Sequence, residues 1–309
     1  MNQKLKHLLC NLLTLVIICV TIAVPSTAAT DLTKQTLTNY SSEFSEGLIE
    51  SYAIPGIPSM IPQGFTKFTY NNVNYFAISA YSSTSGVSSK LYILKADTGT
   101  LVKTFTLPTT SHVGGVHITT ENLFVADSTN KRLGRISLAT LMGTKTSLSS
   151  FEYTYALNHT ASYVTKYDGV YWVGCWVEGA TSTKLYGYDS LSTSGTNTPD
   201  YTVTVPANIQ GITFLGSTTT FALSQSYGRH NKSTILTYTN TSLTSSSTTN
   251  ITSKSPTKTI VPCMLEETVY YGGNLYLLFE SATNKYYYDT TDKATYPMDH
   301  LCTIAKSKL

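Results

Sequence analysis

The stretch Pro62-Gln-Gly-Phe-Thr-Lys-Phe68, followed by Tyr75-Phe-Ala-Ile-Ser-Ala-Tyr81 and Lys90-Leu-Tyr-Ile-Leu94, decides the fold of this 309-residue chain. The unit opens with a polar residue and a glycine, continues into a strand-like segment and turns. A more apolar segment then ends in small polar residues, and a third strand-like segment follows. Threonine, tyrosine and β-branched residues favour the pleated, half-buried surface of a β-strand. The unit therefore predicts three consecutive strands.

The same three-segment unit recurs four more times after Leu94. Its equivalent positions are Gly64, Gly115, Ala161, Gly211 and Glu267, which are separated by steps of 51, 46, 50 and 56 residues. Four-stranded propeller blades repeat at about 40 to 50 residues, whereas solenoid repeats are usually shorter. No stretch of the mature chain shows sustained helical periodicity. The sequence therefore predicts an all-β fold, a β-propeller of five blades.

The segment Gly47–Ile54 precedes the first unit and is predicted to form a lone strand. The fifth unit contains only three strands before the chain stops at Leu309, so this lone strand could supply its missing outer strand. Pairing beside His300–Ile304 would close the ring and protect edges that would otherwise be exposed. A sixth blade would be present if residues 31–60 contained more strands than this one.

The N-terminus has the features of an export signal. Lys4 and Lys6 precede an uncharged apolar run from Leu8 to Val24, and small residues follow Pro25. This pattern predicts a secretory signal peptide at residues 1–28, with an uncleaved membrane anchor as the alternative. Residues 29–46 are predicted to be a loose leader and residues 47–309 a single propeller domain. We expect a secreted, extracellular protein with no stable membrane insertion after cleavage.

Charge and cysteine content exclude several classes of partner. Removal of residues 1–28 takes two lysines from 21 basic and 18 acidic residues, so the net charge becomes 21 − 2 − 18 = +1. A nearly neutral chain without a basic stripe gives no reason to expect nucleic-acid binding. Three cysteines remain, Cys175, Cys263 and Cys302, which excludes a disulfide-dense scaffold. We expect a monomer.

Four segments carry a resemblance to a known group of proteins: Pro62-Gln-Gly, His112-Val-Gly-Gly, Ser226-Tyr-Gly-Arg229 and Phe279-Glu-Ser-Ala. With the blade pattern, they resemble secreted bacterial β-propellers whose role is unassigned. The likeness to lactonase-type and lyase-type propellers is one of architecture only. Because many functions share one fold, this resemblance does not fix an activity.

Two sets of polar residues should meet at one mouth of the central channel. The first strand of each blade lines the channel, and the loops after the second strands lie on the same face. The starts of the first strands contribute Gln63, His112, Gln210 and Glu266, and the loops after the second strands contribute Tyr81, Asp127, Arg229 and Glu280. Structural roles compete with ligand contact for most of them, such as a loop ion pair for Arg229.

Alternation along a strand limits which neighbours can share the channel. Side chains of adjacent strand residues point to opposite faces, so only one of Glu266 and Glu267 should face the axis. His112 and His117 are five residues apart and should likewise point to opposite sides, unless Gly114-Gly115 bends the strand. We expect His112 to be the channel residue and His117 to be packed or exposed.

Two functions remain open. The first is binding of a small polar ligand or glycan at the channel mouth, to which Gln63, Tyr81, Asp127, Gln210, Arg229 and Glu280 would contribute. The second is a hydrolase or lyase in which His112 and Glu266 transfer protons or hold a divalent metal, with Arg229 clamping an anionic group. No Gly-x-Ser-x-Gly elbow, His-Glu-x-x-His motif or phosphate-binding loop is present.

Overall fold

The computed structural model describes Tyr40 and residues 42–309. The predicted signal peptide, residues 1–28, and most of the predicted leader lie outside these described residues. Among the described residues, none of the helices has the length and apolar character needed to span a membrane.

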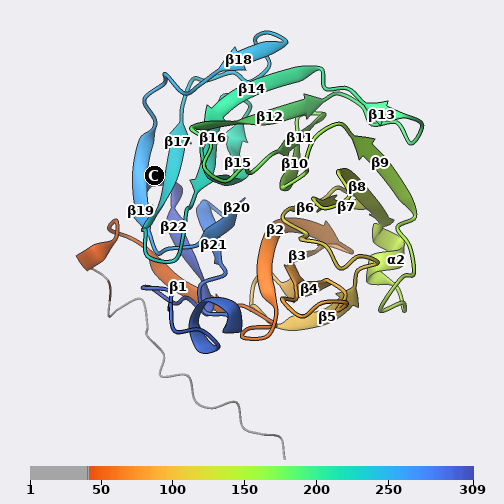
Figure 1. Cartoon of the computed structure of the whole chain (residues 1–309), viewed down its shortest axis with the longest axis horizontal. Coiled ribbons are helices and arrows are strands. Elements are labelled where there is room, and N and C mark those ends of the chain that lie inside the picture. The colour runs from red at the N-terminus through yellow and green to blue at the C-terminus, as the bar shows by residue number, and fades with distance from the viewer. Residues whose placement is uncertain (1–39, 41) are drawn as a thin grey trace, which may run out of the picture. The chain divides into compact units, whose positions relative to one another are not determined.

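Five antiparallel sheets surround a common axis, which confirms the predicted five-bladed β-propeller (Figure 1). Neighbouring innermost strands contact one another around the whole ring. Blade one consists of β2 (Ile61–Tyr70), β3 (Val73–Tyr81), β4 (Lys90–Lys95) and β5 (Leu101–Thr106). Blade two consists of β6 (Val116–Ile118), β7 (Asn122–Asp127), β8 (Arg132–Ser137) and β9 (Tyr153–Leu157), with the short helix α2 (Leu138–Met142) between its last two strands.

The other three blades follow the same order from the axis outward. Blade three is β10 (Tyr163–Tyr167), β11 (Val170–Gly174), β12 (Ser182–Tyr188) and β14 (Tyr201–Pro206). Blade four is β15 (Ile209–Ser217), β16 (Thr220–Gln225), β17 (Ser233–Tyr238) and β19 (Thr257–Val261). Blade five is β20 (Leu265–Tyr271), β21 (Asn274–Phe279), β22 (His300–Ala305) and β1 (Ile49–Ala53).

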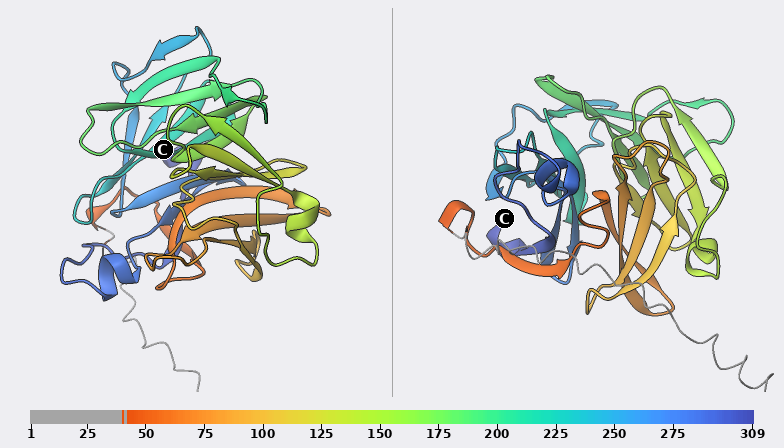
Figure 2. Two further views of the ribbon diagram at one scale, coloured as in Figure 1. Left: turned by 45° about the vertical axis from the view of Figure 1, so that its right-hand side comes forward. Right: turned by 60° about the horizontal axis from the view of Figure 1, so that its bottom comes forward.

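Two short strands connect neighbouring blades at their outer edges (Figure 2). The strand β13 (Thr196–Asn197) leaves blade three and pairs in parallel with β9 of blade two. The strand β18 (Thr248–Asn250), at the end of the serine- and threonine-rich loop of blade four, pairs in parallel with β14 of blade three. Both outer edges are therefore covered by chain from the next blade.

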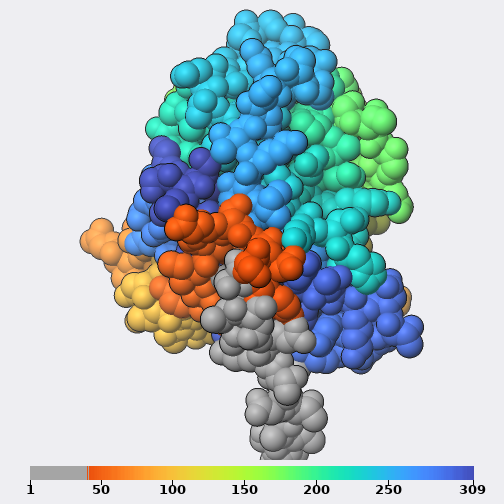
Figure 3. All heavy atoms as spheres, turned by 90° about the vertical axis from the view of Figure 1, so that its left-hand side faces the viewer, coloured from red at the N-terminus to blue at the C-terminus, as the bar shows by residue number. Residues whose placement is uncertain are grey.

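The ring closes as the sequence predicted. The first described strand, β1, pairs antiparallel with β22, and the register places Glu50 opposite Cys302 and Ala53 opposite His300. Figure 3 shows the first described residues, in red, on the surface beside C-terminal residues in dark blue. Because the last blade combines β1 from the start of the described chain with three strands from its end, opening the ring would require this pairing to break.

The last residues of the predicted leader are held in place rather than loose. The Ser45 amide donates to the Ile260 carbonyl at 3.0 Å, and the Ser45 hydroxyl accepts from the Ile260 amide at 2.8 Å. The Phe44 ring packs edge-on against Tyr296, with 5.0 Å between ring centroids. These contacts attach the segment to β19 and to the loop before β22.

Apolar and aromatic side chains fill the space between blades. The Tyr167 and Phe214 rings, from blades three and four, stack with centroids 4.4 Å apart. Trp172 is only 2% exposed within the same cluster. Burial of such side chains stabilises the fold by about 1.5–3 kcal/mol each. Most aromatic residues therefore serve packing, and Cys175, Cys263 and Cys302 are all buried free thiols.

Candidate functional site

A cavity of about 370 Å³ lies where the first strands begin and the second strands end, at one mouth of the channel. All five blades contribute to its wall. The lining residues are Gln63, His112, Gly114, Ser128, Thr160, Ser162, Trp176, Gln210, Glu266, Glu280 and Tyr286. Five of the eight predicted site residues therefore meet at one cavity.

Two carboxyl groups hydrogen-bond each other in this cavity. Glu266 and Glu280 are 4% and 7% exposed, and the Gln63 amide donates to Glu280 Oε2 at 2.7 Å. Burial raises the pKa of both carboxyls above the ordinary range, and their mutual hydrogen bond raises the pKa of Glu266 further while lowering that of Glu280. Glu266 therefore keeps its proton and donates it to the Glu280 carboxylate.

A lysine and two tyrosines stand behind this carboxyl pair. The η2 turn (Asn284–Tyr288) carries Lys285, whose ammonium donates to the Tyr81 hydroxyl at 2.9 Å. Tyr286 hydrogen-bonds both Glu280 and Tyr81. The Lys285 charge acts to lower the pKa of Glu280, opposing the effect of burial. The pair is thus connected to one cation without direct ion pairing.

His112 lies against Tyr81, with 3.7 Å between the ring centroids. Although His112 keeps an exposed surface, partial desolvation, and secondarily the Lys285 charge, lower the pKa of His112 to about 4. The imidazole is therefore neutral at neutral pH and is a hydrogen-bonding group rather than a resident cation there. Close backbone packing fixes its loop, because a Cβ atom at Gly114 would lie 1.9 Å from the Ser162 carbonyl oxygen.

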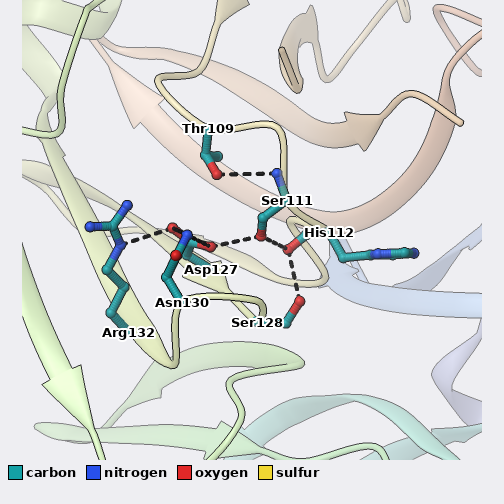
Figure 4. A network of polar contacts seen from close by, with 7 residues as sticks. All are labelled: Thr109, Ser111, His112, Asp127, Ser128, Asn130 and Arg132. Carbon is teal, nitrogen blue, oxygen red and sulfur yellow. Dashed lines mark hydrogen bonds and ion pairs between the residues drawn. The ribbon is translucent and has the colours of Figure 1, made fainter. Parts of the chain in front are cut away.

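Asp127, predicted to contact ligand, is not among the lining residues. Its carboxylate accepts from Ser111 Oγ at 2.7 Å, from the Asn130 amide at 2.9 and 3.0 Å and from Arg132 Nε at 2.9 Å. Ser111 Oγ in turn lies 2.9 Å from the His112 carbonyl oxygen, and Figure 4 shows the His112 side chain directed away from this network. Asp127 therefore holds the main chain that carries His112.

Arg229, predicted to clamp an anionic group, also lies outside the cavity lining. Its guanidinium donates to the Asp292 carbonyl at 2.5 Å and lies 3.4 Å from the Asp292 carboxylate. It also lies over the Tyr286 ring, 5.2 Å from the centroid. The structure therefore places Arg229 in a loop ion pair that supports Tyr286, which is the structural alternative considered above.

A second cavity, of about 250 Å³, opens at the opposite end of the channel. Glu267 and His117 line it, together with threonines from other inner strands. The prediction that only one of Glu266 and Glu267 would face the channel was wrong, and His117, predicted to be packed or exposed, lines this second cavity. A β-bulge between Leu265 and Thr268 interrupts the alternation, so Glu266 and Glu267 face opposite ends of one channel. In blade two the cause is different. The strand β6 begins only at Val116, so His112 lies before the two glycines and outside the strand whose alternation was used for the prediction.

Three side chains of metal-binding kinds line the channel mouth, His112, Glu266 and Glu280, but among the described residues their ligand atoms do not all lie close enough together to share an ion. In the part of the chain that the structure describes, the one group of histidine, cysteine and acidic residues close enough to share an ion is Glu50, Asp299 and His300. These residues lie where β1 meets β22. A divalent metal held by His112 and Glu266 would therefore require these side chains to move closer together, with Glu280 as a third ligand.

Two important cavity residues were not predicted as site residues. Trp176 follows β11, and its buried indole Nε1 has no hydrogen-bond partner among the described residues. Tyr286 and its neighbour Lys285 lie on the irregular turn η2, between β21 and β22. No strand periodicity reaches that turn, so the repeat could not place it. The aromatic run Tyr286–Tyr288 was the only available signal.

No protein-family model and no curated protein matches this sequence. Solved structures match in fold. Kuenenia stuttgartiensis hydrazine synthase is 9% identical, with a TM-score of 0.41 over 72% of this chain and 58% of that one. Myxococcus xanthus glutaminyl cyclase is 10% identical, with a TM-score of 0.43 over 75% and 91%. BamB from Moraxella catarrhalis is 10% identical, with a TM-score of 0.35 over 82% and 61%. The chain thus spans little more than half of the first of these, and no activity follows from likeness at this level.

Proposed function

We propose that this five-bladed propeller binds a small polar ligand in the cavity at the channel mouth. The observation that carries the proposal is a cavity lined by polar groups from all five blades, together with a buried indole N–H that has no partner among the described residues. Trp176 Nε1 is buried without a partner. Gln210 lines the same cavity, and no residue in the described part of the chain bonds its amide. Buried polar groups are normally satisfied, so a ligand is the natural partner for the Trp176 indole, and the half-buried Gln210 amide is free to contact the same ligand.

A thermal-shift screen of small polar compounds, followed by tryptophan fluorescence, tests this proposal. Trp176 lines the cavity and Trp172 is buried in blade three, so a ligand should perturb the emission of Trp176. Gln210→Ala should weaken binding of a hit by about tenfold, corresponding to one or two lost hydrogen bonds. Gln225→Ala is the matched control, because Gln225 lies in the same blade and bonds the Ala207 carbonyl instead. Equal binding by the two variants would contradict the proposal.

We propose further that binding takes place outside the cytoplasm. The charged start, apolar run and small residues of positions 1–28 support export. Sequencing the N-terminus of the protein recovered from the source cells should find a start near residue 29. Recovery of the full-length chain in the membrane fraction would instead favour an uncleaved anchor.

One observation favours a second candidate function, a hydrolase. Two buried carboxyls that share a proton can activate a water molecule, with one acting as base and the other as acid. Glycosidase carboxyls are separated by about 5 Å or more. The hydrogen-bonded carboxyls of Glu266 and Glu280 are closer than that, so the pair is not arranged as in a glycosidase. Turnover of any substrate should then be abolished by Glu266→Gln and by Glu280→Gln alike, with the fold preserved.

A further inference from the structure

We propose that the ligand of the channel-mouth cavity carries an ammonium group, which binds between Glu266 and Glu280 and replaces the proton that they share. This inference rests on the proposed function, because it names the chemical class of the ligand. It is carried by the composition of the cavity wall, by the position of the nearby cations and by the charge balance of the carboxyl pair.

The wall of the cavity carries acidic groups and no basic side chain. Glu266 and Glu280 are the charged residue types among the described lining residues, and His112 is the sole imidazole. The two nearest cations are directed elsewhere, since Lys285 donates to the Tyr81 hydroxyl and Arg229 bonds Asp292. A carboxylate or phosphate ligand would therefore meet buried acids without a facing cation. A cationic ligand would instead meet two acidic groups that no basic side chain of the described wall neutralises.

Aromatic rings beside the carboxyl pair add to this preference. A cation is attracted to the face of an aromatic ring, and most strongly to that of tryptophan. Trp176 lines the cavity, and none of the cation–ring contacts among the described residues involves it. Tyr286 already lies 4.8 Å from Lys285 and 5.2 Å from Arg229. Trp176 is thus the ring left for a ligand cation.

Charge balance favours exchange of the proton for the ammonium. Without an ammonium ligand, the pair holds one proton and one negative charge, which the nearby Lys285 balances. An ammonium that displaces the proton leaves two carboxylates and two ammonium groups, so the local charge is again zero. Burial raises the pKa values of both carboxyls, which favours retention of the proton until a cation replaces it. The bound ammonium stabilises the charged forms instead, so binding releases a proton and should tighten as the pH rises.

Three ring compounds of similar size test the proposal by isothermal titration calorimetry. They are trans-4-aminocyclohexanol, cyclohexane-1,4-diol and 4-hydroxycyclohexanecarboxylate, which are cationic, neutral and anionic at neutral pH. We expect the amine to bind about tenfold or more tightly than the diol, and the carboxylate to bind most weakly. Above about pH 7, the pKa of Glu280, the pair holds one proton, and there the amine should bind up to about tenfold more tightly per pH unit, as release of one proton requires. Titrations in two buffers of different protonation enthalpy would count that proton.

Glu266→Gln and Glu267→Gln form a matched pair of variants. Both replace a buried acid at the same bulge, but Glu266 lines this cavity whereas Glu267 lines the opposite one. Glu266→Gln should weaken the pH dependence and remove most of the preference for the amine over the diol. Glu267→Gln should leave all three affinities near those of the wild type. Both variants should fold, because glutamine has nearly the shape of a protonated glutamate and is likewise uncharged.

The outcomes separate this inference from the proposed function. Tighter binding of the diol or the carboxylate, or amine binding without proton release, overturns the ammonium assignment and leaves a polar-ligand site. Failure of all three compounds also overturns it, if the thermal-shift screen still yields a hit that Gln210→Ala weakens. Absence of any such hit overturns the proposed function as well.

Discussion

Asp127 and Glu280 lie at the ends of the second strands of blades two and five, and the two acids occupy equivalent positions in the repeat. Each follows an apolar strand, and each is buried in the folded chain. Their partners differ. Asp127 accepts from a serine, an asparagine and an arginine, whereas Glu280 shares a proton with a second carboxyl and accepts from an amide.

This difference distinguishes a structural acid from a candidate site acid. The Asp127 carboxylate has partners on both oxygens, one of them a cation, and it faces a loop rather than a cavity. The Glu280 carboxyl lines a cavity and is buried without a directly paired cation. A buried acid that is fully satisfied by the protein contributes to stability, while one left with another acid is available to a ligand.

The largest effect should come from Asp127→Ala. Loss of the carboxylate leaves Arg132 and two polar side chains without their buried partner, which should cost about 3–5 kcal/mol of unfolding free energy. Urea denaturation measures this cost. Asp127→Asn, which keeps part of the hydrogen bonding, should lose less. A cost below about 1 kcal/mol for Asp127→Ala would show that the network is not structural, and would return Asp127 to the candidate ligand contacts.

The repeat predicted the fold because each blade is a local unit. A period near 50 residues was visible in the sequence, and the closing strand followed from counting strands in the fifth unit. The meeting of Gln63, His112, Gln210 and Glu266 at one cavity follows from the same symmetry, since equivalent positions of the blades surround the axis. The function of these four residues does not follow from the symmetry, because the position of a side chain in the repeat does not determine its hydrogen-bond partners.

Features that break the repeat could not be predicted from it. The bulge at Glu266 and Glu267 turns two adjacent acids toward the axis, and simple alternation allowed only one. Lys285 and Tyr286 lie on a turn that has no counterpart in the other blades. Arg229 is paired with Asp292, some sixty residues further along the chain, a contact that sequence spacing does not reveal.

The second largest effect should be on the pH dependence of stability, and it concerns Glu267, a third buried acid. Its carboxyl accepts one long hydrogen bond, of 3.5 Å, from the Phe65 amide. Burial raises its pKa well above the ordinary value, as burial also does for Glu266. The folded state therefore holds protons that the unfolded state releases above about pH 4.5, so these acids make stability fall as the pH rises. His112 and His117, with pKa values lowered to about 4, act in the opposite direction only below about pH 6.5.

Between about pH 6.5 and pH 8, wild-type stability should therefore fall, and Glu267→Gln should reduce that fall by up to about 2 kcal/mol. Urea denaturation at several pH values measures the slope. Because His112 and His117 are already neutral in this range in both states, they do not affect the comparison. An identical slope for the variant and the wild type would show that Glu267 titrates normally.

A smaller effect should follow from Gln63→Ala. The Gln63 amide donates to Glu280, in the role that the Arg132 guanidinium fills for Asp127. Loss of this hydrogen bond should cost about 1–2 kcal/mol of unfolding free energy. The cost is limited because Glu280 can respond by holding a proton more tightly, a response that the Asp127 network does not need. Thermal unfolding measures the cost, and Gln210→Ala, which removes no protein hydrogen bond, should change stability by less than about 0.5 kcal/mol. A larger loss for Gln210→Ala would reveal a structural role for that residue.

The smallest effect should come from Arg229→Ala. Its ion pair with Asp292 is partly exposed, with Asp292 64% exposed, so its loss should cost less than about 1 kcal/mol and less still at high salt. Ligand affinity should change by less than about twofold, since Arg229 acts only through Tyr286 and Asp292. Loss of binding for an anionic ligand would instead give Arg229 the clamp role that the sequence suggested. Measuring unfolding and binding on one variant thus decides whether the loop ion pair belongs with Asp127, as structure, or with Glu280, as site.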